Sequence, residues 1–469
     1  MRSIVWFRGK DLRVTDHGPL AEAAAAGEVI PLFVLDPWFF APARARELPH
    51  RMQFLLDSLR ALEADLARLG SRLLVVAGRS VEVVPRLASQ WRADQVLAHR
   101  WVEPLGRERD RRVTLALGSA GIAFHLLEGE TLLPPGSVRN GQGDMFRVFT
   151  PFSRSCWTRL DLGQRPPGPP PLPMVPGGLE VEVVPIPSLA ELGIPFNARI
   201  QPGGEGQAQA RMQAFLEGPI GTYGTDRDRM DRAGTSRLSA DLKFGTLPAR
   251  RLWQAAAASE PSESTPRFLN ELLWREFSHH LLWERPDLLE GPFRKVFQGF
   301  PWRDDAAGWQ AWTEGRTGYP VVDAAARQLR AEGFVHNRAR MVAASFLTKH
   351  LLIDYRLGEA HYLKWLTDGD WAQNNAGWQW SAGCGCDAQP WFRIFNPVTQ
   401  GKRFDPEGSY VKRWLPELAN CPVAHIHEPW KAPGSLRLRL DYPNPIVDHA
   451  LARERFLATA KGHLGQGRP

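Results

Sequence analysis

The sequence predicts an α/β chain that combines a doubly wound parallel-sheet domain at the N-terminus with an all-helical domain at the C-terminus. Short β-rich runs alternate with amphipathic helical runs up to about residue 133, and from about residue 207 onward the pattern is almost wholly helical. A chain of 469 residues is also too long for one hydrophobic core. We therefore expect domains at residues 1–133 and 207–469, separated by a connector at 134–206.

The N-terminal domain should contain parallel strands, because regular alternation of strand and helix requires right-handed crossover connections. No GxGxxG follows the first β-rich run, so a tight dinucleotide-binding turn is not predicted. We expect any ligand of this domain at the carboxyl ends of its strands. The expected strands are 3–7, 29–35, 72–77, 95–100 and 122–127, and helices are expected at 52–69 and 107–117.

The connector loses all periodicity and accumulates Pro and Gly, as in RPPGPPPLPMVPGG at residues 165–178. This composition predicts a long, semi-rigid segment at the surface. Four aromatic residues are expected to anchor its first part to a domain: Phe146, Phe149, Phe152 and Trp157.

The charge balance favours a polyanionic partner. There are 58 Lys plus Arg against 51 Asp plus Glu, a net charge of +7 and a pI near 9.4, although a solvated basic surface would give the same balance. The 18 Trp exceed what a core of this size needs and suit stacking on bases or relaying electrons.

The cysteines do not form a disulfide framework or an ordinary metal site, because Cys384 and Cys386 are one residue apart and Cys156 and Cys421 are distant. We expect reduced thiols and no metal.

No charged leader precedes the first β-rich run, and no apolar run approaches the ~20 residues that span a bilayer. These features predict a soluble, cytoplasmic protein that binds no membrane.

Residues 334–400 carry polar groups where a helical core should be apolar. Buried groups of this kind must be paired. A hydrogen-bond network that joins two helices would explain any one of these polar residues. A flat polar ligand bound between two helices would form hydrogen bonds with all of them, and Trp378, Trp380 and Trp391 would line its binding site with apolar rings. The polar residues are His336, Asn337, Arg338, Arg340, Asp368, Asp370, Asn374 and Asn375.

Three strings in this region, HNRARM, DGDWAQNNAGWQW and FRIFNPVTQGKRFDPEG, resemble the flavin and lesion site of the photolyase and cryptochrome family, most closely its bacterial-type cyclobutane-pyrimidine-dimer photolyases. The likeness runs from WFRGKDLRVTDHGPL to WLPEL, nearly the whole chain. It implies a carbon–carbon lyase for light-dependent DNA repair, in which excited reduced FAD donates an electron to a pyrimidine dimer flipped out of UV-damaged DNA. A monomer is expected. The alternative is a cryptochrome-type blue-light receptor that signals through a protein partner.

The cofactor site begins with GTSRLSADLKFG at residues 234–245, where hydroxyls and free N–H groups at a helix start suit a diphosphate. An ordinary N-cap explains the same residues. The resemblance implies that Asn374 lies beside the flavin N5 and that Arg340 pairs with Asp368. No His or Cys is placed for a covalent flavin linkage. The implied FAD-binding residues are Tyr223, Thr235, Ser236, Arg237, Leu238, Ser239, Arg340, Asp368, Asp370 and Asn374.

The lesion site includes Glu271 and Trp274, one helical turn apart on a face that would otherwise be apolar. The resemblance implies that Glu271 stabilises the radical anion of the dimer. Alternatively, Glu271 is an isolated charge on the helix surface.

Met341 best distinguishes cyclobutane-dimer repair from (6-4) repair, because relatives that act on (6-4) photoproducts carry His at this position and at that of Asn337. Core filling is its alternative role. The implied lesion contacts are Glu271, Trp274, Asn337, Arg338, Met341, Trp380 and Arg393.

The family commonly reduces its flavin in light through three Trp in a row. The matching positions are Trp378 nearest the flavin, Tyr355 in the middle and Trp302 at the outside. Oxidation of a tyrosine at neutral pH requires loss of its phenolic proton, so we expect slow transfer through Tyr355 unless Trp365 or Trp371 provides a bypass.

A second, antenna chromophore is expected. Folate-binding members carry an Asn-Glu pair where this chain has Leu105 and Gly106, so a deazaflavin or FMN type is favoured over methenyltetrahydrofolate, and its identity stays open.

Overall fold

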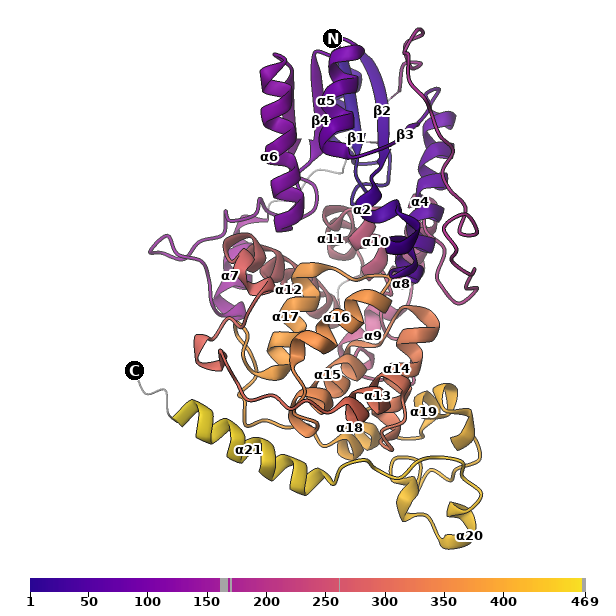
Figure 1. Ribbon diagram of the computed structural model, residues 1–469, viewed down its shortest axis with the longest axis vertical. Helices are drawn as coiled ribbons and strands as arrows, with labels where there is room; N and C mark the ends of the chain where they lie inside the picture. Colours follow the sequence, from indigo (N-terminus) through magenta and orange to yellow (C-terminus); the bar gives the residue numbers. More distant parts are fainter. Residues whose placement is uncertain (161–167, 169–170, 261, 466–469) are drawn as a thin grey trace. The chain divides into compact units, whose positions relative to one another are not determined.

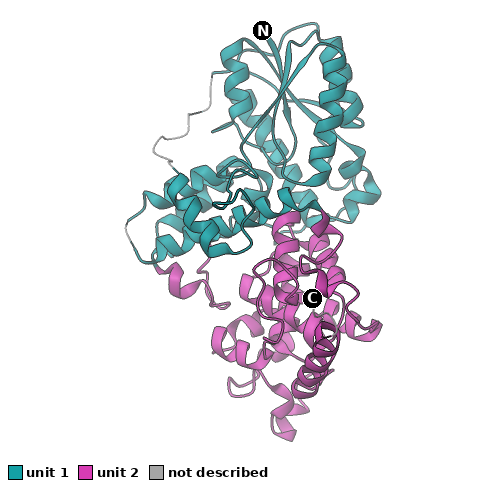
Figure 2. Cartoon of the chain, turned by 90° about the vertical axis from the view of Figure 1, so that its left-hand side faces the viewer, with its two compact units in different colours: residues 1–221, 236–286 teal, residues 222–235, 287–469 magenta. Residues whose placement is uncertain are grey.

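The computed structural model describes all residues except 161–167, 169–170, 261 and 466–469 (Figure 1). The chain divides into two compact units (Figure 2). The first contains Met1–Gly221 and Ser236–Pro286, and the second contains Thr222–Thr235 and Asp287–Pro469.

The first unit is built on a parallel five-stranded sheet, as predicted, with the strand order β3-β2-β1-β4-β5. The order reverses between β1 and β4, so the carboxyl ends of these two strands form the topological switch point at which ligands of such sheets bind. The strands are β1 (Arg2–Phe7), β2 (Glu28–Leu35), β3 (Leu74–Ala77), β4 (Gln95–His99) and β5 (Ala123–Leu127).

Helices cover both faces of this sheet because successive strand residues point to opposite sides. Val5 and Phe7 of β1 pack in a core with α1 and α4, whereas Ile4 and Trp6 pack in a second core with α5 and α6. The expected doubly wound arrangement is thereby confirmed. The helices of this unit are α1 (Gly18–Ala26), α2 (Pro37–Phe40), α3 (Pro42–Arg46), α4 (Pro49–Arg68), α5 (Ser80–Gln90), α6 (Pro104–Ser119), α7 (Phe149–Arg159), α8 (Glu205–Leu216), α10 (Ser239–Phe244), α11 (Ala249–Ala257) and α12 (Ser264–Glu284).

Three of the four aromatic residues expected to anchor the connector lie in α7 and contact helices of the first unit, whereas Phe146 precedes α7 and lies 6.1 Å from Phe152 of the same segment. The ring of Phe149 stacks on Trp274 of α12, with centroids 3.7 Å apart and planes at 8°. Phe152 lies 5.1 Å from Phe277, and Trp157 lies 4.9 Å from Trp253. Residues 165–167 and 169–170 of the expected Pro-rich run lie outside the described residues.

The second unit is helical. Its caps follow the sequence signals: α14 begins at Pro320 and ends before Gly333, whose φ of 60° is left-handed, and the side chains of His336, Asp354 and Asp370 cap α15, α16 and α17. The helices are α13 (Ala306–Glu314), α14 (Pro320–Glu332), α15 (Asn337–Ser345), a π-helical turn (Phe346–His350), α16 (Tyr355–Trp365), α17 (Trp371–Ala382), α18 (Pro397–Phe404), α19 (Ser409–Trp414), α20 (Gly434–Arg437) and α21 (His449–Gly465), and α9 (Pro219–Asp226) spans the boundary with the first unit.

Two further observations concern the chain as a whole. No helix in the described part of the chain has the length and apolar character needed to cross a membrane. All four cysteines are buried free thiols.

Candidate functional site

The residues predicted to bind the cofactor and the lesion form two groups, one in each unit. Ser236, Arg237, Leu238, Ser239, Glu271 and Trp274 belong to the first unit. The second unit holds Tyr223, Thr235, Trp302, Asn337, Arg338, Arg340, Met341, Tyr355, Asp368, Asp370, Asn374, Trp378, Trp380 and Arg393.

In the second unit, Arg340 and Asp368 form an ion pair. Arg340 Nη2 donates to Asp368 Oδ2 at 2.9 Å, and its Nε donates to the carbonyl of Val335 at 2.7 Å, so the guanidinium is fixed in place. The other carboxylate oxygen of Asp368, Oδ1, is buried and has no hydrogen-bond partner. A buried acceptor without a donor is costly, and a donor from a bound ligand would satisfy it.

Asn374 lies one turn into α17, the helix that Asp370 caps. Its Nδ2 donates to the backbone carbonyl of Glu359 at 3.0 Å, which orients the amide and leaves its oxygen as an acceptor. The neighbouring Asn375 donates to Glu359 Oε1 at 3.0 Å. Burial raises the pKa of the Glu359 carboxyl to about 7, although the bond from Asn375 acts in the opposite direction. Glu359 therefore changes protonation near neutral pH.

The first turn of α15 presents its predicted residues at the surface rather than in the core. Asn337 is exposed, Met341 is half-buried, and Asn337 Nδ2 lies 3.7 Å from Met341 Sδ. Arg338 Nη2 donates to Asp228 Oδ1 at 2.6 Å, and its guanidinium lies 4.3 Å from the ring centre of Phe404. Because Met341 is only half-buried, core filling does not explain it.

The remaining predicted lesion residues of the second unit are also accessible. Trp380 on α17 is half-buried, and Arg393 is exposed. The backbone carbonyl of Arg393 accepts from the buried Lys349 Nζ at 2.7 Å, so the chain near this arginine is tied to the core.

In the first unit, Glu271 and Trp274 lie one turn apart on α12 and are both half-buried. The stacked Phe149 fixes the orientation of the Trp274 indole. The sequence predicts Phe149 only as an anchor of the connector. Its role beside Trp274 depends on a contact across 125 residues (149 to 274), which no local pattern signals.

The turn before α10 has the backbone form of an anion-binding site. Arg237 has a left-handed φ of 52°, and Leu238 follows with φ −90° and ψ 5°. Successive residues of this kind point their N–H groups into one concavity. Ser236 Oγ accepts from the backbone N of Leu238 at 3.4 Å.

Two of the expected redox-active rings are in contact with each other. Trp302 and Tyr355 are in ring contact, with centroids 6.4 Å apart. The ring of Trp378, however, contacts Tyr362 at 5.2 Å and Trp312 at 6.1 Å. Burial raises the pKa of the Tyr355 phenol, whose oxygen is buried and has no hydrogen-bond partner.

Comparison with known proteins identifies this arrangement. Residues 3–174 match the family model described as DNA photolyase, and residues 268–462 match the FAD binding domain of DNA photolyase. The deoxyribodipyrimidine photo-lyase of Thermus thermophilus is 42% identical over 98% of this chain and 98% of its own length. This chain belongs to the DNA photolyase family.

Two solved photolyase structures have the same fold. The bacterial class III photolyase from Agrobacterium tumefaciens is 36% identical, has a TM-score of 0.92, and is matched over 99% of this chain and 98% of its own. The archaeal photolyase from Sulfolobus tokodaii, solved with two FAD molecules, is 29% identical with a TM-score of 0.82, over 98% of this chain and 100% of its own.

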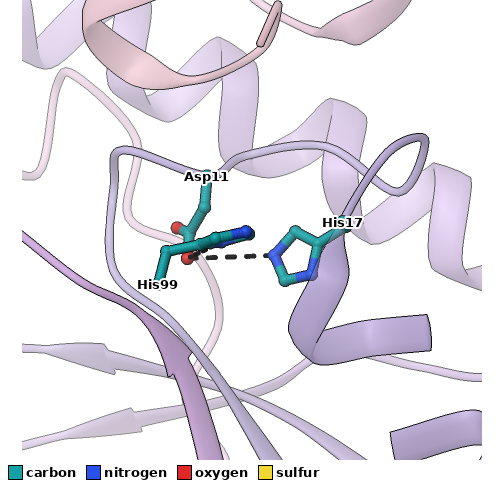
Figure 3. Close-up of side chains that lie close together, drawn as sticks. All are labelled: Asp11, His17 and His99. Atoms are coloured by element: carbon teal, nitrogen blue, oxygen red, sulfur yellow. Dashed lines mark hydrogen bonds and ion pairs between the residues drawn. The ribbon is translucent and has the colours of Figure 1, made fainter. Parts of the chain in front are cut away.

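One cluster of this photolyase family member was not anticipated from its sequence. Asp11, His17 and His99 come together, buried, at the switch point between β1 and β4 (Figure 3). Asp11 Oδ2 lies 3.4 Å from His99 Nδ1 and 3.8 Å from His17 Nε2. Burial lowers the pKa of both imidazoles, that of His99 to about 3. Burial alone would raise the pKa of Asp11, but the two histidines hold it well below its usual value.

The tautomer of His17 decides what this cluster can do. Its Nδ1 accepts the backbone N–H of Leu20 at 3.1 Å and so caps α1. The ring proton of the neutral imidazole is therefore on Nε2, which faces Asp11. A metal ion at Nε2 would require loss of that proton or of the helix cap. The cluster is better explained as a carboxylate between two neutral imidazoles.

Proposed function

We propose that this protein is a light-driven DNA repair enzyme that splits cyclobutane pyrimidine dimers. The observation that carries the proposal is the polar set of Arg340, Asp368 and Asn374, which lies within the residues that match the FAD binding domain of DNA photolyase. The family relation over the whole chain supports it.

The residues present fit FAD. Asp368 Oδ1 is a buried acceptor that lacks a donor, and a ring N–H or a ribose hydroxyl of FAD would supply one. The oriented amide of Asn374 can accept a hydrogen bond at the flavin N5. The backbone concavity at Arg237 and Leu238, with Thr235, Ser236 and Ser239 around it, suits the diphosphate. Tyr223 and Asp370 complete the proposed set, and binding is non-covalent.

FAD, when bound and reduced, supplies a light-absorbing one-electron donor for the dimer. The protein's part is to flip the dinucleotide out of the duplex, exclude water and stabilise the developing negative charge. Glu271 is the proposed hydrogen-bond donor to the dimer radical anion. Trp274 and Trp380 supply flat apolar contacts to the thymines.

Preference for cyclobutane dimers over (6-4) products is inferred from Met341 and Asn337. A half-buried thioether beside an amide offers an apolar, polarisable contact to the thymine pair and no titratable group. Arg338 and Arg393 are the proposed phosphate contacts. We infer that the enzyme acts as a monomer in the cytoplasm.

An antenna chromophore of deazaflavin or FMN type is proposed for the N-terminal unit. Leucine and glycine have no hydrogen-bonding side chain, so Leu105 and Gly106 cannot offer the polar side chains of a folate site, and a Cβ at Gly106 would lie 2.7 Å from the Trp101 ring. The second flavin of the Sulfolobus relative supports a flavin-type antenna.

The decisive experiment illuminates an oligonucleotide that contains one cyclobutane thymine dimer in the presence of the reduced holoenzyme. Recovery of thymine absorbance is expected in light and not in the dark, and a matched oligonucleotide with a (6-4) product should stay unrepaired. Failure to repair the dimer by a preparation with full FAD content would reject the proposal and favour a cryptochrome-type receptor.

A further inference from the structure

We propose that Trp378, Trp312 and Trp309 form a second electron-transfer path that reduces the flavin in light and bypasses Tyr355. This inference rests on the proposed function, because it requires bound FAD with Trp378 as the nearest tryptophan. It concerns residues of the second unit alone.

The rings of this path are in continuous contact. The centroids of Trp378 and Trp312 are 6.1 Å apart in an edge-to-face arrangement, and those of Trp312 and Trp309 are 5.6 Å apart with planes at 26°. Both separations lie within the range of aromatic rings in van der Waals contact. Electron transfer falls steeply with the gap between rings, so contact at every link favours this path.

The direction of the path suits a hole that moves outward. Trp378 is 3% exposed and Trp312 is 2% exposed, whereas Trp309 is only partly buried. Trp312 Nε1 donates to the backbone carbonyl of Ala343 at 3.1 Å, a neutral acceptor that holds the indole without removing its proton. An oxidised Trp309 can release its indole proton to water, which traps the hole at the surface.

Proton chemistry separates this path from the one through Tyr355. A tryptophan can lose an electron and keep its proton, but a phenol must lose both at neutral pH. The Tyr355 oxygen has no hydrogen-bond partner to take that proton, and burial, with the charges of Cys384 and Glu359, raises its pKa. Tyr355 is therefore a poor middle link, although it contacts Trp302.

One of the two candidate bypass residues, Trp365, has positive charge beside its ring. Arg330 and Lys364 lie 5.6 Å and 5.5 Å from the ring centre of Trp365, so positive charge opposes a hole there. The side chain beside both Trp309 and Trp312 is His361, whose ring centroid lies 5.7 Å and 5.6 Å from theirs. Burial, together with the positive charges of Arg330 and Lys364, lowers the pKa of His361 to about 4, so this imidazole is neutral.

With FAD bound, Trp378 would give one electron to the photoexcited oxidised flavin, Trp312 would then reduce the oxidised Trp378, and Trp309 would reduce the oxidised Trp312. The net change is one electron gained by the flavin and one electron and one proton lost by Trp309, the proton passing to water. An external thiol reductant restores Trp309 by giving up a hydrogen atom.

The test uses transient absorption on the oxidised holoenzyme and its Trp309→Phe, Trp312→Phe, Tyr355→Phe and Trp302→Phe variants at equal FAD content. The long-lived tryptophan radical should fall several-fold in the first two variants and stay near the wild-type yield in the last two. Trp365→Phe is the matched control. A several-fold loss in Trp302→Phe with a wild-type yield in Trp309→Phe would overturn the path.

A second measurement locates the radical directly. Illumination of wild-type holoenzyme with a nitroso spin trap, followed by peptide mapping, should place the adduct on Trp309, and an adduct on Trp302 alone would reject the proposal. If the chemically reduced wild-type enzyme failed to repair dimers while light still produced the Trp309 adduct, the proposed function would fall and the electron path would stand.

Discussion

Arg338 is held by an ion pair with Asp228, with 2.6 Å between Nη2 and Oδ1. If Arg338 also contacts a DNA phosphate, Asp228 competes with that phosphate for the guanidinium. Asp228→Asn should then strengthen DNA binding at low salt, whereas Arg338→Ala should weaken it and reduce the slope of log K against log salt by about 0.9, the value for one phosphate.

The check is a salt titration of binding by both variants. The matched control is Arg356→Ala, which removes an arginine paired with Asp354 elsewhere on the second unit and should leave the slope for lesion binding unchanged. Equal slopes for wild type and Arg338→Ala would show that Arg338 serves only its ion pair.

The stack of Phe149 on Trp274 predicts a specific loss of lesion affinity. Phe149→Ala removes a contact of about 0.5–1.5 kcal/mol that orients the indole. Binding to dimer-containing DNA should weaken by up to about ten-fold, since 1.4 kcal/mol is a factor of ten, while binding to undamaged DNA stays the same. Phe146→Ala, in the same segment, is the control. A parallel loss for both DNAs would indicate general destabilisation instead.

The buried histidines predict how the stability of the first unit depends on pH. His99 has its pKa lowered to about 3, so below the unfolded value of about 6.5 the unfolded chain binds more protons than the folded one. Stability is therefore complete above pH 6.5 and declines as the pH falls toward 3. Hydrogen exchange of the amides in β1 and β4 at pH 7.5 and 5 should show reduced protection at the lower pH. His99→Asn should flatten this difference, and an unchanged difference would assign it to other groups.

The stability of the second unit should change with pH in the opposite direction, because of Glu359. Its pKa is raised to about 7, so the protonated form is the stable one, and its contribution is present below about pH 4.5 and lost as the pH rises through 7. Exchange protection in α16 and α17 should fall between about pH 4.5 and 7. Glu359→Gln, which keeps an acceptor for Asn375, should remove the fall. A fall of the same size in that variant would contradict the assignment.

The sequence predicted the sheet well because its signals are local. Each expected strand is a short apolar run bounded by turn residues. The helices expected at 52–69 and 107–117, however, begin later than α4 and α6, which start at Pro49 and Pro104. What could not be predicted depends on contacts between distant residues. The Asp11 and His99 pair spans 88 positions, and the Arg338 and Asp228 pair spans 110. Periodicity carries no information about such pairs.

The path through Trp378, Trp312 and Trp309 also could not be predicted from the sequence, although two of its residues are close in sequence. Trp309 and Trp312 are three residues apart in GWQAWTE, the spacing that places two rings on one face of a helix. That spacing was visible, but it is equally typical of a core stripe. Only the contact of Trp312 with Trp378, 66 positions away (312 to 378), distinguishes a relay from a core.

The Tyr355→Trp variant tests why electron transfer through position 355 is slow. An indole at position 355 removes the need for proton loss at the middle link beside Trp302, so it should raise the yield of long-lived reduced flavin. In a Trp309→Phe background, where the other path is cut, Tyr355→Trp should restore photoreduction and Tyr355→Phe should not. The larger ring costs about 1–3 kcal/mol of packing energy, so the variants are compared at equal FAD content. If Tyr355→Trp gave no gain in either background, the gap between residue 355 and Trp378, rather than the phenolic proton, would limit that path.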